Sequence, residues 1–177
     1  MTLMNRLTLS AGTIRIVIAI IVIAFLSPLT GCYSFKDISI PPEVKTVKVS
    51  YFENKARYVN PQLSPRLADR LRQKIVNQTR LTQTNNDDAD YVISGYVSDY
   101  SITTTGISAQ QASSNRLNVS FHLILKDNTT QKTTESDVTR SFDFSANLSL
   151  QAAEAQLFED ILKNLTDEIF NKIFSNW

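Results

Sequence analysis

The sequence predicts an α+β fold in which two helices pack on one face of a four-stranded mixed β-sheet, in the order β-α-β-β-β-α. Four stretches alternate apolar and polar residues, as half-buried strands do, and two repeat apolar residues every three to four positions, as amphipathic helices do. One helix separates the first two strands, so these can be parallel, whereas short connections make the later strands antiparallel hairpins. Because each helix has one apolar face, both cover the same side of the sheet.

The first strand is predicted over residues 44–52, and the first helix from Ser64 to about Thr79. The strand prediction rests on apolar side chains that alternate with polar ones, at Val47, Val49 and Tyr51. Ser64 and Pro65 suit a helix cap and a first helical position. An apolar stripe with fourfold spacing follows at Leu67, Leu71 and Ile75, so this segment is the crossover helix between the first two strands.

The second strand begins after the polar turn 85–88 and carries bulky side chains on both faces. One face is expected to hold Tyr91, Ile93, Gly95 and Val97. The other is expected to hold Val92, Tyr96, Tyr100 and Ile102. Two bulky faces are typical of a central strand, and Gly95 in its middle indicates a bulge or a close approach by a neighbouring element.

Residues 103–115 are predicted to form a loop, because they contain no charge and hardly any large apolar side chain with which to pack a core. The strand that follows, over residues 117–126, shows the clearest alternation in the sequence. Its apolar positions are Leu117, Val119, Phe121, Leu123 and Leu125. The polar residues Asn118, Ser120, His122 and Lys126 alternate with them, so this strand is expected to have one buried and one solvated face.

A turn at Asp127 and Asn128 leads to a weaker strand near residues 133–144. Its apolar residues on one side are Val138, Phe142 and Phe144. A long C-terminal helix closes the fold, with an apolar stripe at Leu157, Ile161, Leu165, Ile169 and Ile173. Two pairs of opposite charge spaced by four residues support this helix, Glu159 with Lys163 and Glu168 with Lys172.

Residues 1–31 have the pattern of a bacterial lipoprotein signal peptide. Arg6 and Arg15 flank an otherwise uncharged leader, and an unbroken apolar run covers residues 16–26. That run fits a signal core of about 7–15 residues and is well short of the roughly 20 that a membrane span needs. Residues 29–32, with the sequence Leu-Thr-Gly-Cys, resemble the lipobox read by the lipoprotein signal peptidase, so cleavage is expected between Gly31 and Cys32.

Cys32 is the only cysteine of the chain and the expected site of lipidation. Several fatty acyl chains on the new N-terminus would give an effectively permanent membrane anchor, since each buried CH₂ contributes about 0.8 kcal/mol. An acylated Cys32 leaves no thiol for disulfides, metal ligation or catalysis. The alternative is an ordinary secreted protein with a free cysteine, which would be an unusual exposed thiol outside the cytoplasm.

Three segments follow from the lipoprotein interpretation, with 1–31 as the signal peptide, 32–42 as a lipidated tether and 43–177 as one α+β domain. The tether ends in Pro41 and Pro42, which favour an extended chain. Residues 33–36 contain neither an aspartate directly after the cysteine nor the acidic cluster typical of some surface-exported lipoproteins. The expected location is therefore the periplasm-facing leaflet of the outer membrane.

The charge balance argues against a nucleic-acid partner. The whole chain has 18 basic and 17 acidic side chains, and the leader accounts for two arginines and no acid. The mature chain therefore has a net charge of about −1. Phosphate binding along a nucleic acid would call for a basic face that this composition does not supply.

Candidate catalytic and metal-binding residues are few, and we expect no enzyme activity, cofactor or metal. The only histidine, His122, lies on the polar side of a strand and is interpreted as a surface or interface residue rather than a general base. Asp87, Asp88 and Asp90 lack the spacing and the turn glycine of a calcium loop, so a helix-to-strand turn is the preferred interpretation. The sequence contains neither a glycine-rich phosphate loop nor a Cys/His cluster.

Four basic residues fall on the third and fourth predicted strands and the turn between them: Arg116, Lys126, Lys132 and Arg140. Together they could line one contact with an anion such as a phosphate group. The alternative, which we favour, is that four cations spread over 25 residues of a nearly neutral domain are simply solvated.

Short patterns occur in order along the mature chain and carry a resemblance to a known family. They are Gly-Cys-Tyr-Ser-Phe at 31–35, Ile-Pro-Pro-Glu-Val-Lys-Thr at 40–46, Tyr-Phe-Glu-Asn-Lys-Ala at 51–56, Thr-Arg-Leu at 79–81, Asn-Arg-Leu at 115–117, Asp-Glu-Ile-Phe-Asn-Lys at 167–172 and Ser-Asn-Trp at 175–177. In these patterns the chain resembles the lipopolysaccharide-assembly lipoproteins LptE, in the Bacteroidota-type branch. The fold known for that family, two helices on a four-stranded sheet, agrees with the one predicted above.

The resemblance implies that the chain is a plug and assembly partner of the outer-membrane β-barrel LptD and takes part in delivering lipopolysaccharide to the cell surface. A barrel lumen is polar, so a plug needs hydroxyl and amide side chains without uncompensated charge. The uncharged loop 103–115, with Ser108 and Ala112 as candidate barrel contacts, and the Thr/Ser/Asn-rich turn 128–136 meet this requirement. The alternative is that both are solvated loops of a periplasmic domain.

A second class of function remains open at this point. The same small α+β fold would serve an unrelated periplasm-facing lipoprotein that binds glycan or assists another envelope transporter. Composition does not separate the two classes. The sequence also has no local motif onto which the lipopolysaccharide contacts of the LptE family can be placed.

Overall fold

The structure, a computed structural model, describes residues 40–108 and 111–175. Its elements are β1 (Thr46–Asn54), α2 (Leu63–Gln78), β2 (Thr82–Gln83), β3 (Tyr91–Ser108), β4 (Gln111–Asp127), β5 (Lys132–Ser145) and α3 (Leu150–Phe174). The predicted signal peptide, the cleavage position between Gly31 and Cys32, and most of the tether lie outside the described residues. No described helix is both long enough and apolar enough to cross a membrane.

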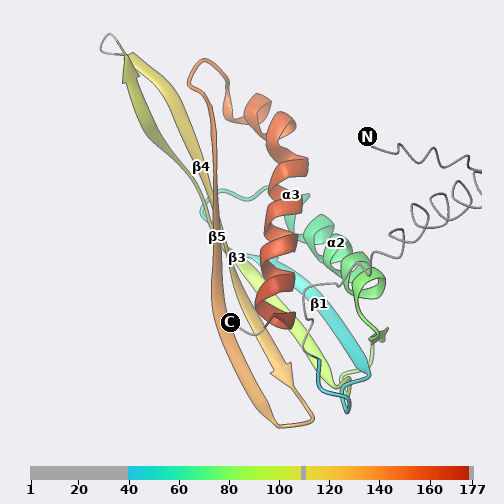
Figure 1. Ribbon diagram of the computed structural model, residues 1–177. Helices are drawn as coiled ribbons and strands as arrows, with labels where there is room; N and C mark the ends of the chain where they lie inside the picture. The colour runs from blue at the N-terminus through green and yellow to red at the C-terminus, as the bar shows by residue number, and fades with distance from the viewer. Residues whose placement is uncertain (1–39, 109–110, 176–177) are drawn as a thin grey trace, which may run out of the picture. The chain divides into compact units, whose positions relative to one another are not determined.

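The strands form one mixed sheet in the order β2-β1-β3-β4-β5. β1 is parallel to both β2 and β3, whereas β3, β4 and β5 form two successive antiparallel pairs (Figure 1). The predicted α+β class, with two helices and a mixed sheet, is confirmed. The sheet has five strands rather than four, because residues 82 and 83 form a strand that is too short to show any alternation in the sequence.

Both helices lie on the same face of the sheet, as predicted (Figure 1). α2 packs mainly on β1, and α3 packs on β5 and β4 and also contacts α2. The core between helices and sheet is apolar, and its fully buried side chains include Phe52, Phe121, Leu67, Leu71, Ile161 and Leu165. Among residues 40–108 and 111–175, the sheet therefore has one face covered by helices and one helix-free face.

Gly95 lets an aromatic side chain cross the middle of the sheet. It pairs with Phe52 of β1, and a Cβ atom at this position would lie 2.7 Å from the Phe121 ring and 2.2 Å from the His122 carbonyl oxygen. The Phe121 ring uses this space and meets the Phe52 ring edge-on, with the ring centroids 4.8 Å apart. The close approach predicted for Gly95 is confirmed, and it links β1, β3 and β4.

A register shift between Val97 and Asp99 changes the side on which the end of β3 presents its side chains. The prediction that Tyr100 and Ile102 face away from Val97 is wrong. Beyond the shift, Tyr100 pairs with Val119 of β4 and is buried on the helix-covered face. The cause is one extra residue in β3, which reverses the alternation from that point onward.

The prediction of a loop over residues 103–115 is wrong. β3 and β4 continue as a paired hairpin up to Ser108 and Gln111, whereas the pairing of β4 with β5 ends at Ser114 (Figure 1). Backbone pairing needs no apolar core, and the β-branched run at 103–105 favours an extended backbone. The domain therefore carries a two-stranded extension, here called the hairpin extension, beyond its five-stranded sheet.

Asp90 fastens the start of β3 to the start of β1. Its carboxylate accepts hydrogen bonds from the backbone N–H groups of Lys45 (2.8 Å) and Thr46 (2.9 Å) and from the Thr46 hydroxyl (2.9 Å). These hydrogen bonds lower the pKa of Asp90, and the largest effects come from the backbone N–H groups of Lys45 and Thr46. The acidic turn before β3 thus has a structural role.

The chain enters the domain at the end of the sheet opposite to the hairpin extension. Arg80 donates hydrogen bonds of 2.8 Å to the carbonyl oxygens of both Ile40 and Pro41. β1 begins a few residues later and runs parallel to β3, so both strands start at this end. We call it the entry end and the other the hairpin end.

The first helix begins differently from the prediction. Ser64 is not the cap of α2, because the helix starts at Leu63 with Gln62 as an N-cap residue that makes no side-chain hydrogen bond. The Ser64 hydroxyl is buried and donates to the Glu53 carbonyl oxygen (3.3 Å). α3 begins earlier than its apolar stripe, with the Ser149 side chain accepting the N–H of Ala152 as its cap.

The space at Gly95 generates a stability prediction. We expect Gly95→Ala to lower the free energy of unfolding by about 3 kcal/mol, the upper part of the range for overpacking, because the Cβ meets a backbone oxygen that cannot rotate away. Chemical denaturation of the full chain measures this change. Ser94→Ala, on the helix-free face next to it, is the control and should change the value by no more than about 0.5 kcal/mol. Equal midpoints for the two variants would contradict the proposed crossing of β3 by Phe121.

Candidate interaction surface

The helix-free face of the sheet carries a polar surface that extends over β3, β4 and β5. The pairing register aligns its side chains in rows, with one member from each strand. We call it the polar sheet face; its polar residues are Ser94, Tyr96, Asp99, Ser101 and Thr103 on β3, Arg116, Asn118, Ser120, His122 and Lys126 on β4, and Thr133, Glu135, Asp137, Thr139, Ser141 and Asp143 on β5. Val92 on β3 and Ile124 on β4 are apolar members of the same rows. Hydroxyl, amide and charged groups of both signs are the chemistry of a wet protein contact.

Side-chain hydrogen bonds run across the strands within this face. The Ser141 hydroxyl donates to the Asn118 amide oxygen (2.8 Å), and the Asn118 amide nitrogen donates to the Thr103 hydroxyl (3.3 Å). The hydroxyls of Ser120 and Thr139 lie 2.9 Å apart. These bonds join β3, β4 and β5, so the donors and acceptors of the surface have a fixed arrangement.

Arg116 and Asp143 form a bidentate ion pair on the same face, toward the hairpin end. The guanidinium Nε lies 2.7 Å from Oδ1 and a terminal nitrogen 3.0 Å from Oδ2. This hydrogen bonding lowers the pKa of Asp143 and raises the pKa of Arg116. Because both side chains are about half exposed, the pair contributes little to stability, but it neutralises the charge of the surface at this point.

His122 is the centre of an aromatic and charged cluster on the polar sheet face. Its Nδ1 lies 2.8 Å from an Asp137 carboxylate oxygen and its Nε2 lies 3.3 Å from one of Glu135. The Tyr96 ring lies against the imidazole with centroids 5.0 Å apart, and the Lys55 ammonium lies 4.1 Å from the Tyr96 ring centre. The hydrogen bond to Asp137 is the main cause that raises the pKa of His122 above its ordinary value.

The structure does not gather the four basic residues that the sequence offered as one anionic contact. Arg116 and Lys126 lie on the polar sheet face, whereas Lys132 and Arg140 alternate to the other side of β5. Arg116 is paired with Asp143, and Arg140 forms an ion pair with Glu168 of α3. They therefore form no single patch.

The remaining residues singled out in the sequence have structural positions. Asp87 pairs with Lys48, which lowers the pKa of its carboxyl group, and Asp90 binds the backbone of β1. Across residues 40–108 and 111–175, no group of three or more His, Cys, Asp or Glu is arranged to hold a metal ion. Ser108 and Ala112 take part in the pairing near the tip of the hairpin extension.

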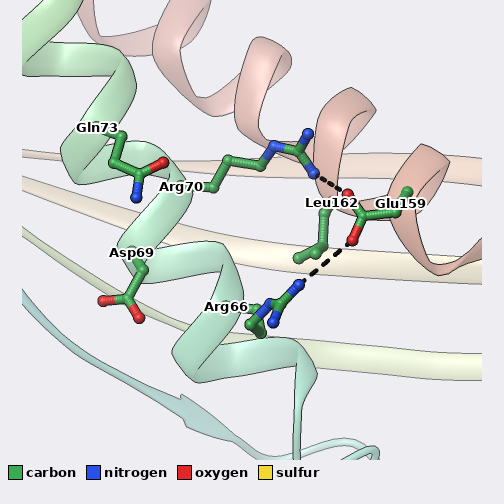
Figure 2. A pocket seen from close by; sticks show the side chains of 6 residues that line it. All are labelled: Arg66, Asp69, Arg70, Gln73, Glu159 and Leu162. Atoms are coloured by element: carbon green, nitrogen blue, oxygen red, sulfur yellow. Dashed lines mark hydrogen bonds and ion pairs between the residues drawn. The ribbon is translucent and has the colours of Figure 1, made fainter.

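A second polar site lies between α2 and α3. Arg66 and Arg70 of α2 point toward Glu159 of α3, with nitrogen-to-oxygen distances of 3.4 Å and 2.7 Å (Figure 2). The hydrogen bond from Arg70 is the main cause that lowers the pKa of Glu159. These groups line an open hollow of about 360 Å³. The exposed ion pairs connect the two helices and contribute modestly to stability.

One candidate binding group was not predicted from the sequence. Glu154 of α3 is buried, and Tyr100, Asn60 and Tyr58 donate hydrogen bonds to its carboxylate. A signal existed, because Glu154 precedes Ile161 by seven residues and therefore lies on the apolar stripe of the helix. An acidic residue at a core position of an amphipathic helix marks a buried polar site.

The fold and these surfaces define a small α+β domain, in which one side of the sheet packs a core and the other carries an ordered polar surface. The chain belongs to the LptE family of lipopolysaccharide-assembly proteins. The family model matches residues 44–173, from just before β1 to the last turn of α3. The resemblance to the LptE family noted in the sequence is confirmed at the level of the family.

Solved structures share this fold. CT253, a hypothetical protein from Chlamydia trachomatis, has a TM-score of 0.53 at 9% identity, covering 73% of this chain and 95% of that one. XCC0632 from Xanthomonas campestris has a TM-score of 0.51 at 12% identity, covering 79% and 92%. Rare lipoprotein B from Shewanella oneidensis has a TM-score of 0.49 at 13% identity, covering 71% of this chain and 92% of that one. No curated protein matches the chain by sequence.

The His122 cluster generates a pH prediction. Because the folded-state pKa is raised above the ordinary value of about 6.5, the protonated ring stabilises the fold fully below that value, and this stabilisation is lost as the pH rises through the raised pKa. We expect Asp137→Asn to lower the pKa of His122 toward about 6.5. Glu135→Gln, the control, should lower it less. NMR titration of the imidazole measures this, since His122 is the only histidine. Equal pKa values in wild type and Asp137→Asn would contradict the assigned cause.

Proposed function

We propose that this chain is a lipoprotein, anchored through Cys32 on the periplasmic side of the outer membrane, which plugs and helps to assemble an LptD-like β-barrel. Membership of the LptE family, matched over residues 44–173, carries the proposal. The signal peptide at 1–31 and the lipobox at Gly31 and Cys32 supply the anchor. In this role the chain binds and positions a partner during lipopolysaccharide assembly and catalyses no reaction.

The polar sheet face has the properties that contact with a barrel lumen requires. A lumen is polar and wet, and polar groups that become buried there must keep hydrogen-bond partners. The hydroxyl and amide groups of Thr103, Asn118 and Ser141 already have fixed positions and can share water or lumen groups. Arg116 brings its own counter-charge in Asp143, so its burial would not leave a lone charge.

The hairpin extension supports the same role by a different property. Between Ser114 and the tip, its two strands pair only with each other. The outer edge of each strand therefore has backbone groups free to contact another surface. Ser108 and Ala112 near its tip are our proposed barrel contacts. The basic residues that we propose for a lipopolysaccharide contact lie on both sides of the sheet. Arg116 and Lys126 are on one side, and Lys132 and Arg140 are on the other.

The anchor is tested first. Cys32→Ser should block lipidation and leave uncleaved precursor in the inner membrane, because the lipoprotein peptidase acts on an acylated cysteine. Mass spectrometry of the protein purified from membranes measures the N-terminus. Ser34→Ala is the control and should be processed normally. A wild-type N-terminus other than acylated Cys32 would overturn the anchor proposal.

The barrel contact is tested by placing charge near the tip of the hairpin extension. Ser108→Asp together with Ala112→Asp should weaken recovery of the barrel, since each carboxylate would be desolvated against lumen groups not arranged to pair it, at a cost of up to several kcal/mol. The isolated lipoprotein should keep its melting temperature, because both positions lie beyond the core. The measurement is a pull-down of the endogenous barrel, paired with a melting curve.

The matched control adds two carboxylates at the entry end, with Asn85→Asp and Asn86→Asp in an exposed turn. This variant should recover the barrel as the wild type does. Undiminished recovery by the hairpin variant would show that the tip lies outside the interface. Failure of the wild-type protein to recover any barrel would favour a periplasm-facing lipoprotein with another partner.

A further inference from the structure

Glu154 is buried near the start of α3, with 8% of its surface exposed, and it lines an open hollow. The hollow has a volume of about 590 Å³, and its other walls include Tyr58, Gln62, Gln151 and Phe158. The carboxylate is therefore largely shielded from bulk water and yet borders a space that a side chain could enter. We call this space the acid hollow.

The hydrogen bonds to Glu154 all come from neutral groups. Oε1 accepts from the Tyr100 hydroxyl (2.7 Å) and the Asn60 amide (3.1 Å), and Oε2 accepts from the Tyr58 hydroxyl (3.2 Å). In the described part of the chain, no Lys, Arg or His forms an ion pair with it. A carboxylate offers about four acceptor positions, so one remains open, on Oε2.

The negative charge of Glu154 is thus held by hydrogen bonds but has no counter-charge. Burying a carboxylate without a cation is costly, and such groups are ordinarily paired. Glu154 raises the pKa values of the two tyrosines that donate to it. The charge of Glu154 is the main cause that raises the pKa of Tyr58, and burial together with the hydrogen bond to Glu154 raises the pKa of Tyr100. A positive group in the acid hollow would complete the site.

Aromatic rings beside the carboxylate indicate which kind of cation fits. Tyr58 is 43% exposed, and its ring stacks on Tyr100 with centroids 5.5 Å apart. Phe158 supplies a second ring in the hollow. Ring faces attract guanidinium and ammonium groups, more strongly where water is excluded. A metal ion would need several charged oxygens, but Glu154 is the one carboxylate that lines the hollow. The site therefore favours an organic cation.

The surroundings of the acid hollow favour a cation carried by a protein. Tyr58, Val59 and Ile102 are exposed apolar side chains near the acid hollow. A second hollow of about 480 Å³ is lined by Tyr58, Tyr100 and Ile102 and by the polar residues Arg57, Ser98, Asp99 and Ser101. A pocket for one anchoring side chain, bordered by apolar surface, is typical of the energetic centre of a protein contact. A small free cation would gain nothing from this border.

We propose that the acid hollow binds the guanidinium or ammonium group of an arginine or lysine side chain from a partner protein. The cation lies against the Tyr58 ring and donates one hydrogen bond to the open position on Glu154 Oε2. This site is on the helix-covered side of the sheet, because Tyr100 and Glu154 meet there. It therefore stands apart from the polar sheet face and does not rest on the barrel proposal.

The chemistry is tested with small probes on the full chain in a maltoside detergent, which carries no charge. N-acetyl-arginine amide should shift the NMR signals of Tyr58 and Glu154, and the citrulline analogue, of the same shape but neutral, should bind at least about tenfold more weakly. Glu154→Gln and Tyr58→Leu should each reduce the affinity for the arginine probe by about tenfold. Glu159→Gln, on an exposed turn of the same helix, should leave it unchanged. Equal binding of the two probes, or full affinity in Glu154→Gln, would overturn the proposal.

The source of the cation is tested in membranes with a photo-crosslinking residue in place of Gln151, which is exposed at the wall of the acid hollow. We expect a protein adduct whose crosslinked peptide contains an arginine or lysine next to the crosslink. The yield of this adduct should fall by about tenfold in Glu154→Gln and should not fall in Glu159→Gln. An adduct of unchanged yield in Glu154→Gln, or the absence of a protein adduct, would overturn the assignment to a partner side chain. The crosslinking result does not depend on whether the hairpin variant recovers the barrel. The barrel proposal and the acid-hollow proposal can therefore be contradicted independently.

Discussion

The ring of Phe121 crosses the backbone of Gly95 to reach the ring of Phe52, and the order of the central sheet depends on this contact. The three residues come from β4, β3 and β1, so one aromatic pair ties together a parallel and an antiparallel strand pairing. A shift of one residue in either pairing would move the apolar set of a strand to the opposite face. The same contact that fixes the core therefore also fixes which side chains form the polar sheet face.

Much of the fold could be predicted from the sequence. A strand or helix that is buried on one face only shows a regular apolar repeat, and most elements of this fold are of that kind. The strict alternation around Phe121 and the stripe through Ile161 and Leu165 predicted β4 from Leu117 onward and the helix α3. β2 was missed because two residues show no period, and the hairpin extension was missed because its strands pair through backbone without a core. The reversed face at Tyr100 follows from a single register shift, which pairing partners reveal and composition does not.

The candidate sites were less accessible to sequence reasoning, since they depend on which distant segments meet. The polar sheet face arises only when three strands align in register, and the same register separates Arg116 from Arg140. Glu154 could have been noticed as an acid on an apolar stripe. Its donors could not, because Tyr100 and Tyr58 lie 54 and 96 positions away in the chain. Sequence patterns record the local partners of a residue well and its remote partners hardly at all.

The fastening of Ile40 and Pro41 by Arg80 has a consequence for how an anchored chain would meet its partner. Seven residues lie between Cys32 and Ile40, so the eight steps from one residue to the next span at most about 28 Å at roughly 3.5 Å per step. The 18 residues of β3 span roughly 60 Å at about 3.3 Å per residue, and the hairpin tip lies at their far end. A lipid at one end and a protein contact at the other would hold the domain at two points. The second attachment is then nearly intramolecular, so even a weak contact at the tip acts at a high effective concentration and fixes the long axis of the domain.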